Sequence, residues 1–181
     1  PNNGGTGQTN AFAAATALST ATADHATVAY NGILYQIGGC TAYTTGVCTS
    51  GSNTTSIRQA DINPDTATAP GQLGSWAASA TTLPAGRSLL QAVAYNGYLY
   101  VIGGRTDSTA AVATVTYTTI GSTGTLGNSW SNADLPGGAE RNAFGAAVMN
   151  GYIYVTGGDN GSGTKKSDVY YAQISTADGS L

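Results

Sequence analysis

Short apolar runs separated by glycine-rich turns follow one another along the chain, and the longest of these runs recurs. The stretch at 30–39, Tyr-Asn-Gly-Ile-Leu-Tyr-Gln-Ile-Gly-Gly, returns with small changes at 95–104 and again at 149–158. Asn-Gly favours a two-residue hairpin turn because both central residues adopt positive φ. The aromatic and β-branched residues behind the turn favour a strand. The pattern therefore predicts three β-hairpins, each ending in a diglycine.

Other markers set the length of the repeating unit. Asn96 and Asn150 lie 54 residues apart, as do Trp76 and Trp130, whereas Asn31 and Asn96 lie 65 apart because the first unit contains an insertion of 11 residues. Self-similarity at a fixed period is typical of repeat architectures, and we expect a single domain built in this way. The expected repeats are about 12–75, 76–129 and 130–181, with the end of a preceding repeat at 1–11.

Each unit predicts four short strands. The second unit has an apolar run on either side of its Asn-Gly turn, then an alternating Val, Thr and Tyr run, then a Gly-rich turn before a tryptophan. The strands expected there are 89–95, 98–102, 112–120 and a short strand that carries Trp130. Segment 11–23, rich in Ala and Thr, shows no 3.6-residue apolar period and is predicted as strand and loop.

The order of these markers resembles the kelch repeat of β-propellers. The resemblance rests on Asn-Gly-aromatic-Leu/Ile-Tyr-Val-x-Gly-Gly, a tyrosine in the third strand, a tryptophan in the fourth, and Leu-Pro followed by Arg87 or Arg141 before the next unit. In that family each repeat forms one four-stranded blade of a ring. The resemblance implies an all-β fold of β-propeller blades with four antiparallel strands, made of three kelch-like repeats with an incomplete blade at each end.

The first unit departs from the family pattern in two places. It has Thr22 where the other units have an arginine, and His25 where they have Leu90 and Phe144. We expect His25 to pack beside a neighbouring blade rather than to act in catalysis. The missing arginine also argues against a symmetric ring of ligand-binding residues.

Three blades are too few for a closed ring, and the chain ends indicate how one could close. Phe12 takes the tryptophan position of a strand without a blade of its own, and 178–181 matches the start of the segment that leads to a tryptophan. Two copies joined head to tail would form a six-bladed homodimer, with the Phe12 strand completing the partner's last blade beside Leu181. If the angle did not close, the same contact would propagate as a filament. The alternative is that these residues are an excerpt of a longer propeller.

Composition excludes several classes of function. Charged residues make up 8% of the chain and hydrophobic residues 41%, which is unlike a disordered segment. A net charge of −3 provides no electrostatic footprint for nucleic acid, and no apolar run reaches the length of a membrane span. We therefore expect no nucleic-acid binding and no membrane insertion. The wealth of Thr, Ser, Ala and Gly resembles secreted or cell-surface kelch-like arrays of bacteria, which implies an extracellular location.

The two cysteines, Cys40 and Cys48, lie in the insertion of the first unit and flank a glycine-containing turn. This placement predicts a hairpin disulfide, which favours an oxidising compartment, and free thiols are the alternative. A metal site is disfavoured because the chain has no further cysteine and one histidine. We expect neither a metal nor another cofactor.

Candidate binding residues lie on loops and beside the repeat boundaries. The resemblance implies that Arg87 and Arg141 either bridge loop carbonyls or an acidic group, or contact ligand at the mouth of a ring. The long loops 41–56, 105–111 and 159–167 are the expected contact regions, since loops on a rigid scaffold carry function. Their candidate residues are Tyr43, Arg105, Asp159 and Asn160.

These observations favour a non-enzymatic extracellular module for adhesion, which binds a protein or glycan ligand or assembles with further copies of itself. Nine acidic residues, six basic residues and one histidine leave few groups for acid–base catalysis. The alternative is a fragment of a carbohydrate-active propeller enzyme whose catalytic residues lie outside this segment. That alternative predicts paired carboxylates from adjacent units, for which Asp24 and Glu140 are the candidates.

Overall fold

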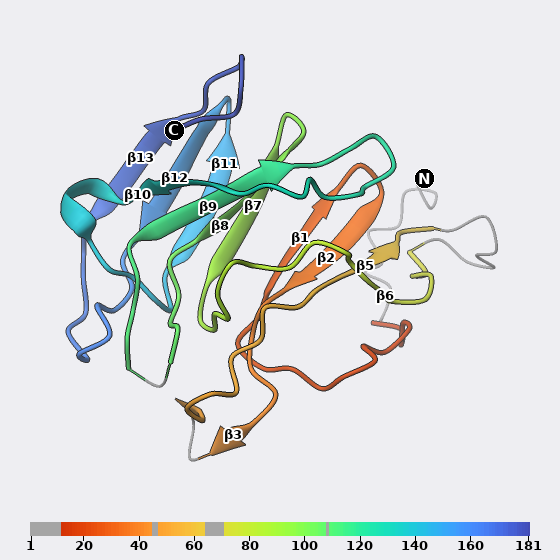
Figure 1. The fold of residues 1–181 in the computed structure, drawn as a ribbon, viewed down its shortest axis with the longest axis horizontal. Helices are drawn as coiled ribbons and strands as arrows, with labels where there is room; N and C mark the ends of the chain where they lie inside the picture. The colour runs from red at the N-terminus through yellow and green to blue at the C-terminus, as the bar shows by residue number, and fades with distance from the viewer. Residues whose placement is uncertain (1–11, 45–46, 64–70, 108) are drawn as a thin grey trace, which may run out of the picture.

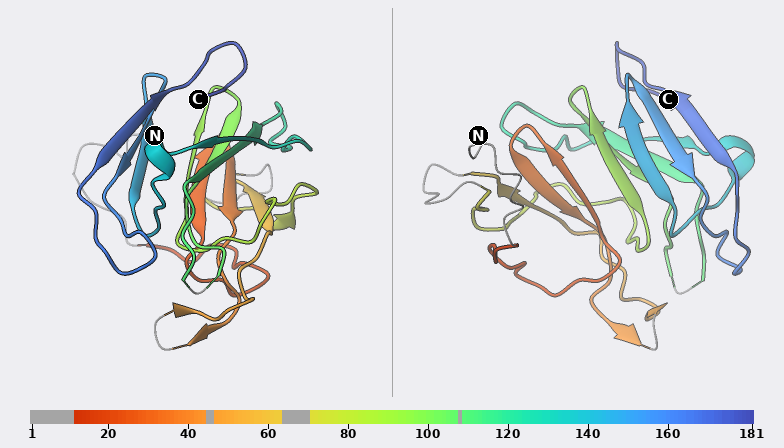
Figure 2. Two further views of the ribbon diagram at one scale, coloured as in Figure 1. Left: turned by 60° about the vertical axis from the view of Figure 1, so that its left-hand side comes forward. Right: turned by 180° about the vertical axis from the view of Figure 1, so that it is seen from behind.

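The computed structural model describes residues 12–44, 47–63, 71–107 and 109–181, and its architecture is all-β (Figure 1). Three antiparallel sheets stand side by side like the ribs of a fan, and we name them blades 1, 2 and 3 in chain order (Figures 1 and 2). The described part of the chain is a row of blades rather than a closed ring. The fold class predicted from the sequence is confirmed.

The strands of each blade are ordered in space as they are along the chain. Blade 1 consists of β1 (Ala26–Tyr30), β2 (Ile33–Ile37), β5 (Ile57–Asp61) and β6 (Ala77–Ala78). Blade 2 consists of β7 (Gln91–Tyr95), β8 (Tyr98–Ile102), β9 (Thr114–Thr119) and β10 (Ser131–Asp134). Blade 3 consists of β11 (Gly145–Met149), β12 (Tyr152–Thr156) and β13 (Val169–Gln173). The insertion adds a small hairpin of β3 (Tyr43–Thr44) and β4 (Val47–Cys48), and a 3-10 turn, η1, spans Pro136–Gly138.

Several boundaries differ from the sequence prediction. The strand predicted at 112–120 spans Thr114–Thr119, and Trp130 precedes β10, which begins at Ser131. The first strand of blade 2 begins at Gln91 instead of 89, because Leu89 has a φ of 53° and cannot continue an extended strand. The described residues 12–22 contain no strand, whereas the sequence predicted one around Phe12. Residue 11 of that predicted segment lies outside the described residues.

The Asn-Gly turns and the diglycines behave as their sequences predict. The three turn asparagines have φ between 47° and 52°, and the glycines that follow them have φ of 78° or 79°. At the diglycines the backbone of a neighbouring blade comes close. A Cβ on Gly38 would lie 2.6 Å from the carbonyl oxygen of Arg87, in the loop that leads into blade 2. Glycine is required there both by its φ and by this approach.

Two hydrophobic cores lie between the blades, and β8 contributes to both. Leu99 and Val101 pack into the core between blades 1 and 2, whereas Tyr100 and Ile102 pack into the core between blades 2 and 3. Successive side chains of a strand point to opposite faces of the sheet. A central blade buries both faces, which is why the sequence of β8 reads as an unbroken apolar run.

Buried tyrosines connect each blade to the next. The Tyr35 hydroxyl in blade 1 donates to the carbonyl of Gly124 in blade 2 at 2.7 Å, and the Tyr100 hydroxyl in blade 2 donates to the carbonyl of Gly179 after blade 3 at 2.8 Å. Burial raises the pKa of Tyr35 to about 12, so the phenol stays protonated and can donate. The glycine acceptors lie in the turns that follow the third strand of each blade.

The blades share one direction, which brings equivalent loops together. Among the first strands, β7 lies between β1 and β11. The later strands of each blade lie progressively farther from this row (Figures 1 and 2). The Asn-Gly turns stand at one end of the fan. The loops between second and third strands gather at the other end, together with the loops that lead into each blade. We call this second end the loop end.

Replacing Tyr100 by Phe should lower the free energy of unfolding by about 1 to 2 kcal/mol, because the buried Gly179 carbonyl loses its donor. Urea denaturation of the purified chain measures this change. Tyr171→Phe is the matched control, since Tyr171 is 70% exposed, and it should leave the unfolding midpoint in place. Equal unfolding free energies for the two variants would contradict the role assigned to the tyrosine–glycine bond.

Candidate functional site

The loop end is organised around three residues that directly follow the diglycines. Cys40, Arg105 and Asp159 occupy equivalent positions, and each forms β-bridges to the loop that leads into its own blade and to the returning loop. The bridge partners of Arg105, for example, are Ser88 and Ala111. These bridges extend each blade at the loop end and hold the three side chains on a rigid support.

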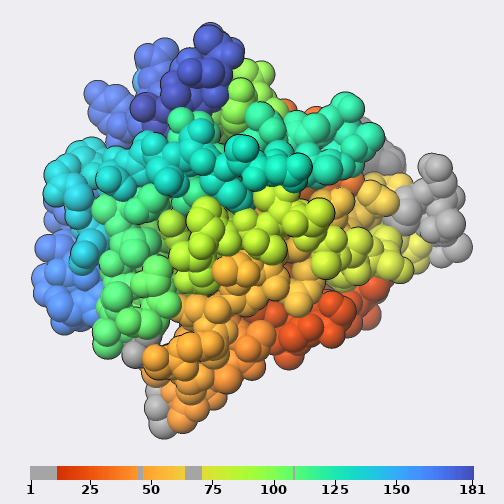
Figure 3. All heavy atoms as spheres, in the orientation of Figure 1, coloured from red at the N-terminus to blue at the C-terminus, as the bar shows by residue number. Residues whose placement is uncertain are grey.

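A disulfide pins the hairpin of β3 and β4. The bond joins Cys40 to Cys48, whose Cα atoms are 5.9 Å apart, as the sequence predicted. The hairpin is also held by hydrogen bonds from the Thr49 amide and the Ser52 hydroxyl to the Ala42 carbonyl. Space-filling Figure 3 shows this segment, in orange, projecting from the loop end.

A small pocket lies where the hairpin meets the loop after β8. Its volume is about 40 Å³, enough for a water molecule but not for an organic ligand. It is lined by Asp24, Tyr43, Val47, Cys48, Ser88, Leu89, Arg105 and Asp107. The structure thus brings Tyr43 and Arg105, two of the residues selected from the sequence, to one site. The exposed fractions of Tyr43 and Val47 are 49% and 45%, so an apolar hairpin tip stands beside the pocket.

Asp159 has several hydrogen-bond and ionic partners at the loop end. Its carboxylate accepts hydrogen bonds from Lys165 Nζ at 2.9 Å and from the amides of Gly161 and Gly163, and Arg105 Nη2 lies 3.7 Å from it. The Lys165 hydrogen bond is the largest contribution that lowers the pKa of Asp159, to about 2. Asp159 therefore closes its own loop and connects blade 3 to Arg105 of blade 2.

The Asn160 side chain also stabilises the loop after Asp159. Its Oδ1 accepts hydrogen bonds from the Ser162 amide and hydroxyl and from the Thr164 amide. Asp107 does similar work in blade 2, where its carboxylate accepts the Thr109 and Ala110 amides, and these backbone bonds lower its pKa. Sequence reasoning passed over Asp107, although an Asp two residues before a Thr is a common signal for a side-chain-capped turn.

Arg87 and Arg141 are buried, and their side chains bond to blade 2 and blade 3, respectively. Arg87 donates to the carbonyls of Gly103 and Thr114 and to the Thr116 hydroxyl, all in blade 2. Arg141 is bonded to Asp168 and to the Tyr170 hydroxyl in blade 3, and its guanidinium lies over the Tyr170 ring. The exposed fractions of the two residues are 6% and 3%. The resemblance implied that such an arginine bridges groups between blades, whereas these contacts lie within the blade that follows each arginine.

The acidic residues considered for metal binding or catalysis lie in loops that lead into the blades. Among the described residues one group of three potential metal ligands comes together, Asp24, Cys40 and Cys48, but both sulfurs are used by the disulfide. The Asp24 carboxylate lies 3.3 Å from Cys48 Sγ. Glu140 lies in the loop that leads into blade 3, whereas Asp24 lies in the loop that leads into blade 1, so blade 2 separates the two carboxylates proposed from the sequence.

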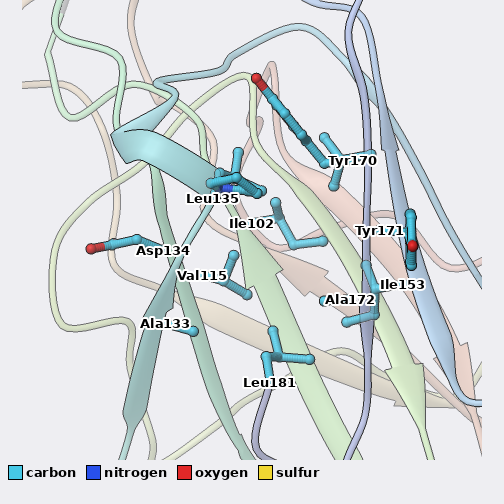
Figure 4. A pocket seen from close by; sticks show the side chains of 12 residues that line it. Ile102, Val115, Ala133, Asp134, Leu135, Ile153, Tyr170, Tyr171, Ala172 and Leu181 are labelled. Atoms are coloured by element: carbon cyan, nitrogen blue, oxygen red, sulfur yellow. The ribbon is translucent and has the colours of Figure 1, made fainter.

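The two residues that the sequence suggested for assembly, Phe12 and Leu181, are both exposed. Phe12 is fully exposed, and Leu181 is 36% exposed at the rim of an apolar pocket between blades 2 and 3 (Figure 4). Sequence reasoning did not find this pocket. Its volume is about 120 Å³, and its lining comes from both blades. The pocket is lined by Ile102, Val115, Ala133, Asp134, Leu135, Pro136, Ile153, Val155, Tyr170, Tyr171, Ala172 and Leu181.

The blades and their loop-end bridges define a β-propeller-like repeat protein. Residues 140–171, which include all three strands of blade 3 except the last two residues of β13, match the family model described as Kelch motif. This match supports the kelch-like repeat that the sequence pattern indicated. No curated protein matches the chain. Across the described ranges, the structure contains no helix long and apolar enough to cross a membrane.

Acid should destabilise the protein through Asp159. Its pKa is lowered from 3.8 to about 2, so its contribution to folding is present above pH 4 and is lost as the pH falls towards 2. Asp159→Asn should therefore lose less stability than the unchanged chain between these values. Lys165→Met, which removes the main cause of the shift, should also reduce this loss, because the folded-state pKa of Asp159 rises back towards its ordinary value. Urea midpoints measured at pH 5, 3.5 and 2 test this, and parallel pH profiles for all three proteins would contradict it.

Proposed function

We propose that this chain is a non-enzymatic, protein-binding module of an exported protein, and that its loop end contacts the partner. The observation that carries the proposal is the disulfide-pinned hairpin, which presents exposed Tyr43 and Val47 beside Arg105. An exposed aromatic residue on a rigid support is a favourable anchor for a protein interface, because little conformational entropy is lost on binding. The Kelch motif match supports protein binding as the general role.

The bonding of the polar groups favours binding over catalysis. The Asp159 carboxylate is committed to Lys165 and to backbone amides of its own loop, and Asp107 is committed to its turn. Both sulfur atoms are in the disulfide. Groups held in this way stabilise the conformation of their loops. A side chain that transfers protons needs a pKa near the working pH, whereas the pKa values of Asp159 and Asp107 are lowered.

The disulfide also supports an extracellular location. Such bonds form and persist in oxidising compartments, and this one closes a loop that has few apolar residues to hold it. An extracellular loop end can meet proteins or glycans. The small volume of the pocket favours a protein surface, since a sugar ring requires a larger recess than about 40 Å³.

Tyr43→Ser should weaken partner binding by roughly tenfold or more, the loss expected when an interface anchor is truncated. The labelled chain is applied to arrays of extracellular proteins and of glycans, and titrations follow on each protein that is bound. Tyr171→Ser is the matched control, because this exposed tyrosine lies on blade 3 away from the hairpin. Signals on glycans alone, or equal losses for both variants, would refute binding of proteins through the loop end.

A second candidate function is self-assembly through the open blade edges, as a homodimer or a filament. It is favoured by the uncovered face of blade 3, where Val169 and Tyr171 of the edge strand β13 are 62% and 70% exposed. Strand edges and sheet faces that end without a neighbour are sites for adding another chain.

Light scattering after gel filtration, over a range of concentrations, tests self-assembly. A closed pair should have twice the mass of the 18.0 kDa chain. Deleting residues 1–14, which include Phe12, should return the mass to that of a single chain. A folded single chain at every concentration would exclude self-assembly and leave the loop-end proposal standing.

A further inference from the structure

The contacts between blades follow a rule that can be read along the chain. The tyrosine in the second strand of one blade donates to the glycine carbonyl in the turn after the third strand of the next, as Tyr35 does to Gly124 and Tyr100 to Gly179. The third tyrosine of the series is Tyr154, and the glycine of blade 1 at the equivalent place is Gly71. Tyr154 is 39% exposed, whereas Tyr35 and Tyr100 are fully buried. Blade 3 therefore has a donor in place for a next blade, and blade 1 has an acceptor in place for a preceding one.

Backbone contacts repeat with the same spacing. The second glycine of each diglycine donates to the arginine carbonyl of the loop leading into the next blade: Gly39 to Arg87 at 2.7 Å and Gly104 to Arg141 at 2.8 Å. The third such glycine is Gly158, and Thr22 has the arginine position before blade 1. Continuing the series with a second copy pairs the Gly158 amide with the Thr22 carbonyl.

A third series involves residues with positive φ. Asp24, Leu89 and Ala143 have φ of 54°, 53° and 50°, and each lies in the loop leading into its blade. The Leu89 amide donates to the Asp24 carbonyl at 2.9 Å, and the Ala143 amide donates to the Leu89 carbonyl at 3.0 Å. The next member of this series is the Asp24 amide of a second copy donating to Ala143. All three series thus lead from blade 3 to blade 1.

The side chains on the open face of blade 3 are those that other blades bury. Val169 corresponds to Val115 of blade 2 and to Ile57 of blade 1 by strand register. Val115 and Ile57 are 3% and 1% exposed, but Val169 is 62% exposed. Valine, tyrosine and methionine side chains on one sheet face form an apolar surface of the kind that marks an interaction site.

The outer pocket between blades 2 and 3 lies where the repeat places an aromatic side chain. Trp130, just before β10, packs on the core between blades 1 and 2, and its Nε1 donates to the Thr82 carbonyl at 2.9 Å. Asp134 holds the place of Thr82 in the following repeat, and it lines the pocket (Figure 4). By this equivalence the pocket takes the aromatic-residue position of blade 3, and within the described residues no fourth strand lies beside β13. Apolar cavities of roughly 150 Å³ accommodate a benzene ring, which is close to the volume here of about 120 Å³.

We infer that blade 1 of a second copy docks on the open face of blade 3, with the partner's Phe12 in the outer pocket and Tyr154 bonded to Gly71 of the partner subunit. This inference rests on the proposed self-assembly and assigns its surface. The occupant is a second copy because this chain supplies, at its other end, each group that the three series require. Phenylalanine in the aromatic position fills the apolar pocket without needing the carbonyl acceptor that the tryptophans use. The contact is head to tail, and two such contacts complete the pair.

Val169→Lys should abolish the assembly, because it places a charge at the position that blades 1 and 2 bury with Ile57 and Val115. Phe12→Asp should do the same from the other side, by removing the ring that enters the pocket. Both residues are exposed in the single chain, so the variants should fold, which circular dichroism verifies. Ser131→Lys is the matched control: this serine is exposed on β10, the outer strand of blade 2, and its substitution should leave the assembled mass unchanged.

Mixing the two blocked variants tests the head-to-tail direction. The Val169→Lys chain retains an intact Phe12, and the Phe12→Asp chain retains an intact blade 3 face, so an equimolar mixture should associate although each variant alone stays at 18.0 kDa. Assembly that survives both substitutions would overturn the assigned surface while leaving self-assembly itself intact. A mixture that stays at the mass of one chain would overturn the head-to-tail contact, and an unchanged chain that never associates would refute both self-assembly and this surface.

Discussion

Packing of each sheet on the next is the interaction on which the remainder of this structure depends. A four-stranded blade has two faces, and in blade 2 both are apolar, with Leu99 and Val101 on one side and Tyr100 and Ile102 on the other. Neither face can be buried within the blade itself, so the blade is stable only between two neighbours, as in other repeat architectures. The diglycines let the loops of adjacent blades approach closely enough for this packing, and the buried tyrosines satisfy turn carbonyls that the packing removes from water.

The same constraint separates the molecule into two regions with different chemistry. At the loop end, the side chains are bonded to one another: the disulfide holds the hairpin, Asp159 holds its loop and contacts Arg105, and the buried arginines hold the blades. At the open face of blade 3, valine and tyrosine side chains lack the neighbour that their equivalents have. A rigid, internally bonded loop end suits recognition of a partner, and an uncovered blade face suits addition of a blade. The two proposals therefore involve different surfaces and can be tested separately.

Much of the fold could be predicted because the repeat multiplies each weak signal. One Asn-Gly pair is a modest indication of a hairpin, but three pairs with equal spacing, each followed by an aromatic strand and a diglycine, indicate a blade. The disulfide was predictable from two cysteines around one turn. The site was less predictable, since Arg105, Asp159 and Asn160 were selected as possible ligand contacts from loop position alone. Their hydrogen bonds to neighbouring loops depend on backbone paths that no local pattern specifies.

The sequence by itself determined the strands, the turns, the order of the blades and the cysteine pair, because these depend on residues close together in the chain and on their periodicity. Tertiary structure decided which repeat-equivalent residues are covered. Tyr35, Tyr100 and Tyr154 are alike in sequence context, yet the first two are buried and the third is exposed. The outer pocket, likewise, is lined by residues of blades 2 and 3 and depends on how the two blades meet. Burial is a property of the neighbour that packs against a side chain, and the glycines that Tyr35 and Tyr100 contact lie 89 and 79 residues away in the sequence.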